Sequence, residues 1–170
     1  MTSNATSQPR NAMMSDDRWK KIEQIRALPA LLEQAVKGLS DEQLDTPYRD
    51  GGWTARQVVH HVADSHMNAM VRMKLILTED HPTVKPYNQD AWAALVDSTA
   101  LPVDVSLQII RGLHSRWTKL LESVGDGDWQ KSAHHPESGT LTLDRILDIY
   151  SAHGEKHVGQ ILGLRRARGW

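Results

Sequence analysis

Cysteine and phenylalanine are both absent from this chain of 170 residues. The lack of cysteine excludes a disulfide framework, a catalytic thiolate, cysteine-ligated zinc and iron–sulfur clusters. It is compatible with a reducing compartment, and we expect a cytoplasmic location. Because phenylalanine is missing, the bulk of the core has to come from leucine, isoleucine, valine, methionine and the six tryptophans.

An excess of charge of one sign and long apolar runs are lacking as well. The 20 Lys+Arg balance the 21 Asp+Glu to a net charge of -1, and basic residues never form a run of five. Strong electrostatic binding to nucleic acid or to an anionic membrane is therefore not expected. Apolar residues make up 39% of the chain but nowhere approach the roughly 20 in succession that cross a bilayer.

The N-terminal segment differs from the rest of the chain. Residues 1–15 are polar, show no periodicity and lack the apolar stretch of a signal peptide. We expect a disordered tail over 1–15. The remaining length suits one domain, which we expect over 16–170.

From residue 16 on, apolar residues recur every three or four positions, which predicts an amphipathic helix up to about residue 39. Pro29 falls inside this pattern. It predicts either a short lead-in helix followed by a main one, or a second helix with Pro29 in its first turn.

Three more long helices follow by the same criterion. One begins after Thr54, which forms a capping box with Gln57; the others cover about 104–124 and the segment that begins at Thr142. No segment predicts a strand, and 127–139 reads as a polar connection. The sequence therefore predicts an all-α fold, a four-helix bundle with long crossover connections.

Histidine is the one residue type in excess, with nine copies. His153 and His157 lie four residues apart on the buried stripe of the last predicted helix, a spacing that suits two imidazoles on one metal ion. The alternative is a pair of packed core histidines. The motif is not that of a zincin, because Glu155 stands two residues after His153 instead of directly after it, and we expect Glu155 on the surface.

A third ligand would come from the second long helix. At about 100° per residue His60 lies opposite the buried stripe and is expected to be exposed, His66 lies beside the stripe, and His61 lies at its flank. The flank suits a ligand directed at a diagonal helix, but periodicity does not choose between His61 and His66, and His66 also fits a partly buried structural residue. The remaining histidines are expected at the surface: His81, His114, His134 and His135.

Three segments together carry a family resemblance. They read GGWTARQVVHHVADSHMN, then LTED-x-PT-x-KPY, and later LTLD-x-x-L-x-x-Y-x-x-H-x-x-x-H. From about Ile22 to Trp170 the chain resembles the DinB-like metalloenzyme superfamily, and within it the YfiT branch, described as metal-dependent hydrolases and as bacillithiol S-transferases.

The resemblance implies a four-helix bundle that binds one divalent metal, usually zinc or nickel. In the family one ligand is a histidine eight residues after the tryptophan that opens the second helix, which here is His61 after Trp53. The other two are spaced i, i+4 on the last helix, which here are His153 and His157. The resemblance also implies a homodimer, an expectation that a tryptophan-rich sequence supports.

Three neutral histidines would leave a tetrahedral zinc with one open position, as in a catalytic site. Such a metal activates water for hydrolysis or a low-molecular-weight thiol for S-transfer. No G-x-S-x-G or H-E-x-x-H motif supplies a base, so the residues slightly favour thiol transfer. Asp64 and Asn68, one and two turns beyond His61, are candidates to orient a ligand or touch substrate.

Other residues and roles stay open. Lys85, Tyr87 and Trp92 are candidates for a pocket wall, with packing the alternative for Trp92. The rival to an enzyme of small molecules is a non-catalytic bundle, stabilised by metal as a dimer or a sensor. Because free imidazole protonates near pH 6.5, metal affinity and stability are expected to fall together through that pH.

Overall fold

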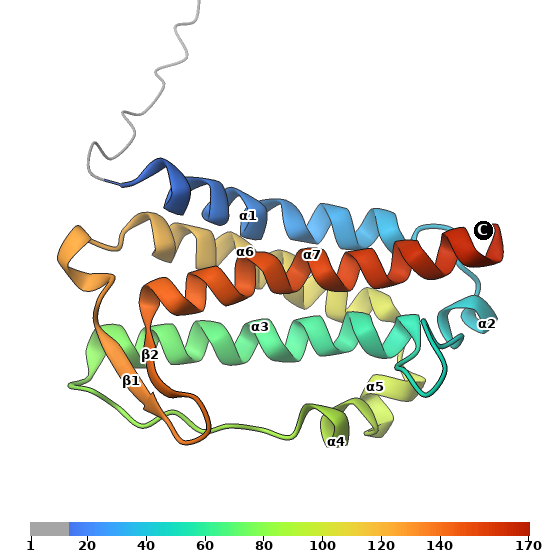
Figure 1. The fold of residues 1–170 in the computed structure, drawn as a ribbon. Coiled ribbons are helices and arrows are strands. Elements are labelled where there is room, and N and C mark those ends of the chain that lie inside the picture. The colour runs from blue at the N-terminus through green and yellow to red at the C-terminus, as the bar shows by residue number, and fades with distance from the viewer. Residues whose placement is uncertain (1–13) are drawn as a thin grey trace, which may run out of the picture.

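The computed structural model describes residues 14–170, so most of the expected tail over 1–15 lies outside the described residues. Four long helices form a bundle (Figure 1). They are α1 (Asp16–Val36), α3 (Ala55–Thr78), α6 (Val103–Glu122) and α7 (Leu143–Arg168). The prediction of a helical bundle with a long crossover is confirmed. None of the helices within residues 14–170 combines the length and the apolar character that a membrane span requires.

The helices pack in a ring in which α1 touches α6 and α7, and α3 touches the same two. After α3 the chain runs back along the bundle over residues 79–102, so that α6 starts near the end where α3 began (Figure 1). This crossover carries α4 (Gln89–Ala93) and α5 (Val96–Ala100), and α2 (Asp41–Leu44) lies between α1 and α3. Helices α3 and α7 are therefore neighbours in the bundle and not diagonal partners.

Local capping determines where α3 begins. The Thr54 side chain accepts a hydrogen bond from the Gln57 backbone N–H at 3.1 Å, and the Gln57 side chain accepts one from the Thr54 N–H at 2.9 Å. This reciprocal pair satisfies two N–H groups that the first turn leaves free. It starts the helix at Ala55, directly after Thr54, and thereby fixes the direction in which the His61 side chain points from α3.

The core consists of two apolar clusters separated by a polar layer. One contains Met73, Trp117 and Ile146, the other Val58, Ile110 and Ile161. Between the two clusters, each of three long helices carries histidine: His66 on α3, His114 on α6, and His153 with His157 on α7. Polar groups buried in this way are costly unless they are hydrogen-bonded or bind an ion.

The break predicted at Pro29 is wrong, because α1 continues through it. Proline has no N–H and cannot donate to the carbonyl four residues earlier, which belongs to Ile25. The Nδ1 atom of His114 on α6 lies 2.5 Å from that oxygen and supplies the missing donor. A tertiary contact thus replaces the helix hydrogen bond that the proline removes.

The prediction that the chain contains no strand is also wrong. Within the connection from α6 to α7, β1 (Ser132–His135) pairs antiparallel with β2 (Gly139–Thr142), and Ser132 lies opposite Thr142. The turn is closed by Gly139, whose φ of 74° is accessible to glycine. Strands of four residues with so few apolar side chains give no recognisable alternation, so their sequence carries no signal.

A glycine between His153 and His157 allows α7 to pack close to α1. A Cβ added at Gly154 would clash with the buried Leu28 side chain, whereas one added at Gly163 on the same helix meets nothing within 4 Å. Alanine gains up to about 1 kcal/mol of helix propensity at either position. Overpacking against Leu28 costs about 1–3 kcal/mol.

We therefore expect Gly163→Ala to have a higher free energy of unfolding than the wild type. We expect the free energy of unfolding of Gly154→Ala to lie about 1–3 kcal/mol below that of Gly163→Ala. Urea unfolding of both variants measures this difference, because the propensity term cancels between them. Equal stability of the two variants would show that α1 yields to the added methyl group.

Candidate metal centre

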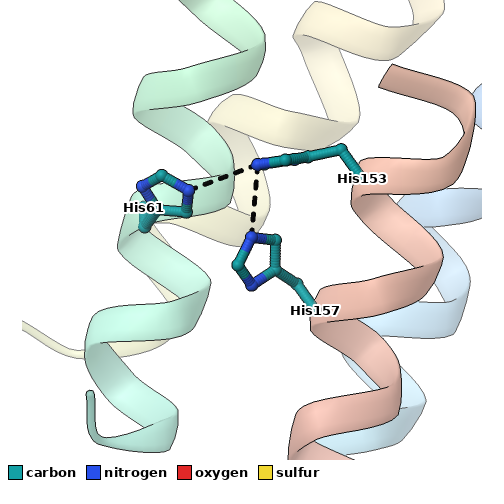
Figure 2. A group of neighbouring side chains, drawn as sticks. All are labelled: His61, His153 and His157. Carbon is teal, nitrogen blue, oxygen red and sulfur yellow. Dashed lines mark hydrogen bonds between the residues drawn. The ribbon is translucent and has the colours of Figure 1, made fainter. Parts of the chain in front are cut away.

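Three histidines from two neighbouring helices meet at one point. His61 comes from α3, while His153 and His157 come from successive turns of α7, and Figure 2 shows their rings turned toward one another. The Nε2 atom of His153 lies 3.3 Å from Nε2 of His61 and 3.2 Å from Nε2 of His157. One nitrogen of each ring lies within 4.8 Å of the other two.

This spacing matches the donor set of a metal ion. Around a tetrahedral zinc with Zn–N bonds of about 2.0–2.1 Å, ligand nitrogens lie about 3.3 Å apart. His157 Nδ1 lies 2.7 Å from Oε1 of Gln160, an acceptor, so His157 carries its proton on Nδ1 and turns the lone pair of Nε2 to the centre. The residues present therefore fit a divalent cation.

All three rings are neutral at pH 7. Burial, reinforced by His157 and Lys156, lowers the pKa of His61 from 6.5 to about 3. Burial with the neighbouring His157 and His61 lowers the pKa of His153 to about 3 as well, and burial lowers that of His157. Neutral imidazole is the form that binds metals.

The centre is accessible from outside the bundle. A pocket of about 380 Å³ reaches the three histidines, and Trp53 forms part of its wall with its ring 4.5 Å from that of His61. Its other lining residues are Tyr48, Arg49, Gly51, Gly52, Gln89, Asp90, Lys156 and Gln160. A second pocket of about 420 Å³, lined by Tyr87 and Tyr150 among others, also reaches His153. The site is therefore open, unlike a structural metal site.

Behind the centre, His153 continues into a row of hydrogen-bonded rings. Its Nδ1 lies 3.1 Å from Nε2 of His66, whose Nδ1 lies 3.0 Å from Nε2 of His114. His66 therefore meets His153 on the side away from the three converging Nε2 atoms. The structure brings His61, and not His66, to the point where the rings of α7 converge.

Three expectations for the remaining histidines are wrong. His60 is buried, because the crossover covers its face of α3 and it is hydrogen-bonded to Ser106 Oγ at 2.7 Å and to the Leu101 carbonyl oxygen at 3.1 Å. His114 is buried in the polar layer. His135, the last residue of β1, is buried, and its Nδ1 accepts from the backbone N–H groups of Glu137 and Ser138 in the hairpin turn. His81, His134 and Glu155 are exposed, as expected.

The candidate polar residues lie on α3 one and two turns beyond His61. Asp64 and Asn68 are half-buried on α3, where the Asn68 side chain donates to the Asp64 carbonyl oxygen, but neither lines the two pockets described above. Burial, with a contribution from Asp97, raises the pKa of Asp64 to about 6. Lys85 is exposed and outside both pockets.

Tyr87 forms part of the wall of the second pocket, as the sequence predicts. Trp92 packs on it with ring centroids 4.5 Å apart and remains outside both pockets, which is the packing role considered as the alternative. The sequence analysis did not predict that Gln160 and Lys156 line the pocket at the centre. Their only signal is their spacing from His157, three residues after it and one before.

Fold and site together define a class of protein, namely a four-helix bundle with an open three-histidine centre suited to a divalent metal. The chain belongs to the DinB superfamily, whose family model matches residues 24–161.

Relatives from Bacillus are similar in sequence to this chain over most of its length. Proteins named "Putative metal-dependent hydrolase" from Bacillus mycoides strain KBAB4 and Bacillus cereus strain 03BB102 are each 51% identical over 154 residues, which cover 91% of this chain and 87% of theirs. A solved structure is similar as well. It is described as "YfiT from Bacillus subtilis is a probable metal-dependent hydrolase with an unusual four-helix bundle topology".

The YfiT structure superposes with a TM-score of 0.90 at 44% sequence identity, over 96% of this chain and 94% of that one. The resemblance to the DinB-like superfamily and its YfiT branch is thereby confirmed.

Proposed function

We propose that this protein is an enzyme that acts on small molecules through one divalent metal ion held by His61, His153 and His157. The convergence of three Nε2 atoms at the floor of an open pocket carries this proposal. Zinc is the first choice, because separations of 3.2 and 3.3 Å match tetrahedral bonding. Nickel, which imidazole ligands also suit, is the second choice.

When bound, such a metal lowers the pKa of a water or a thiol in its open position and polarises an electrophile. The protein contributes the orientation of the ligands and the shape of the pocket. Gln160 holds the His157 ring, and Trp53 covers one side of His61 and shields it from water. Both contacts limit the freedom of the donor set before a substrate binds.

The charge of the pocket favours a substrate with a negative group. Arg49 and Lys156 line it against a single carboxylate, that of Asp90. The positive charge of Lys156 also helps to lower the pKa of all three candidate ligands, so it contributes to the electrostatic potential at the centre. A small anionic substrate would be attracted to this pocket.

Two reactions suit such a centre. Hydrolysis is supported by the names of the relatives. Transfer of a low-molecular-weight thiol, such as bacillithiol, is supported by the side chains: over residues 14–170 no carboxylate is hydrogen-bonded to any of the three histidines, and thiol transfer requires no general base once the thiol is ionised.

The experiment compares the two reactions on one preparation. Zinc-loaded protein is offered monochlorobimane with bacillithiol, mycothiol, glutathione or no thiol, and in parallel a panel of esters and amides. We expect conjugation with one thiol to be faster than cleavage of the panel, because it needs no additional base, and we expect His61→Ala to abolish it.

The other outcomes separate the alternatives. Absence of conjugation with every thiol, together with His61-dependent cleavage of the panel, would leave hydrolysis. Absence of turnover in both assays by protein that retains its metal would favour the non-catalytic reading of a metal-stabilised bundle or sensor.

A further inference from the structure

Two histidines that the proposed function does not use form a buried row behind His153. His66 and His114 are 0% and 1% exposed, and their rings stack with centroids 5.0 Å apart and planes at 12°. Both rings lie nearly perpendicular to the Trp117 ring, and His66 also lies nearly perpendicular to the Tyr150 ring. The row runs from His153 through His66 and His114 to the carbonyl oxygen of Ile25.

The end of this row determines the direction of every hydrogen bond in it. A carbonyl oxygen only accepts, so His114 donates from Nδ1 to Ile25. The His114 and His66 rings are 1% and 0% exposed, and neither is hydrogen-bonded to a carboxylate within residues 14–170, so each is neutral and carries one proton. With its proton on Nδ1, His114 accepts at Nε2 from Nδ1–H of His66. His66 in turn accepts at Nε2 from Nδ1–H of His153.

The consequence reaches the candidate metal centre. A neutral His153 with its proton on Nδ1 has a lone pair on Nε2, the atom that faces His61 and His157. The opposite tautomer would place a proton at that position and block coordination. We propose that His66 and His114 are positioning residues, which hold His153 in the tautomer and ring orientation that bind metal.

Pro29 belongs to the same device. Because it removes the helix donor to the Ile25 carbonyl, that oxygen is available to His114 as an acceptor within the core. The row therefore ends at the Ile25 carbonyl oxygen, where the backbone of α1 itself requires a hydrogen-bond donor. The inference rests on the proposed metal site for its purpose, but the tautomer of His153 is a property of the metal-free protein and is measured without any metal.

The first measurement is nitrogen NMR of the imidazole rings in metal-free, full-length protein, with signals assigned by single substitutions. We expect His114, His66 and His153 all to carry their proton on Nδ1. In His66→Phe, which keeps a ring but offers no acceptor, we expect His153 to lose this preference. In His66→Gln, whose amide both accepts and donates, we expect His153 to keep it.

The second measurement is zinc affinity by competition with a chromophoric chelator. We expect His66→Phe to bind zinc about 10–100-fold more weakly than the wild type, the range typical for loss of a hydrogen bond to a metal-ligating histidine. His66→Gln should restore affinity to within about tenfold of the wild type. His60→Phe is the matched control, because His60 is also buried on α3 but lies outside the row, and it should leave the zinc affinity and the His153 tautomer unchanged.

The outcomes that overturn the proposal are distinct from those that overturn the metal site. Wild-type protein with His153 protonated on Nε2 refutes the row, and so does folded His66→Phe with wild-type zinc affinity. Equal losses of affinity in His66→Phe and His66→Gln with an unchanged His153 tautomer would assign His66 to packing alone. If His66→Phe does not fold, the wild-type tautomer and His66→Gln decide. Wild-type protein that binds no zinc refutes the proposed function instead.

Discussion

Purified protein is expected to contain close to one equivalent of zinc or nickel, and His61→Ala, His153→Ala or His157→Ala is expected to remove most of it. Each substitution leaves two nitrogens where three converge, and the remaining pair makes a weak site. Activity should fall with the metal to the background rate. Elemental analysis of the variants, with the assays above, measures both losses, and full retention of metal in a double His153/His157 variant would contradict the proposal.

Two further substitutions separate metal binding from folding. His134→Ala removes an exposed histidine and should change neither metal content nor stability. His60→Ala should keep the metal but lower the free energy of unfolding, because it leaves the buried Ser106 hydroxyl and the Leu101 carbonyl without their partner. Such an orphaned buried group costs about 1–3 kcal/mol. Loss of metal in His60→Ala with unchanged stability would place His60 at the centre instead.

Acidification is expected to lower the stability of the metal-free protein well before it releases metal from the folded protein. In the folded state burial lowers the pKa of His61 and His153 to about 3, whereas both titrate near 6.5 once unfolded. Between these values the unfolded state binds more protons, so stability is complete above pH 6.5 and falls as the pH drops toward 3. At pH 5.5 each such histidine costs about 1.4 kcal/mol.

Metal affinity should behave differently. Three free imidazoles would lose about a thousandfold in affinity on going one unit below a pKa of 6.5. Because His61 and His153 remain neutral in the folded protein and burial also lowers the pKa of His157, we expect the zinc affinity of folded protein to change less than about tenfold between pH 7.5 and 5.5. The sequence predicts that affinity and stability fall together, whereas the burial of the three rings predicts that they respond differently to pH.

Urea unfolding of metal-free protein and zinc competition at pH 7.5 and 5.5 test the two halves independently. A stability that is flat over this range, or an affinity that falls about a thousandfold, would show that the histidines titrate as in water.

The parts of this protein that its sequence determines are those set by near neighbours along the chain. The capping box of Thr54 and Gln57 places the start of α3 from four residues of sequence. The i, i+4 spacing alone puts His153 and His157 on one face of α7. The choice of His61 over His66 needed more than periodicity, and came from the resemblance of whole segments to a family.

What only the tertiary structure decided depends on contacts between segments far apart in sequence. A helical wheel gives the direction of His60 but not the crossover that covers it, and gives the direction of His114 but not the Ile25 carbonyl that it meets. Pro29 predicts a helix break unless a donor arrives from another helix. His61 and His66 both point inward, and only the placement of α7 beside α3 directs one to the Nε2 side of His153 and the other to its Nδ1 side.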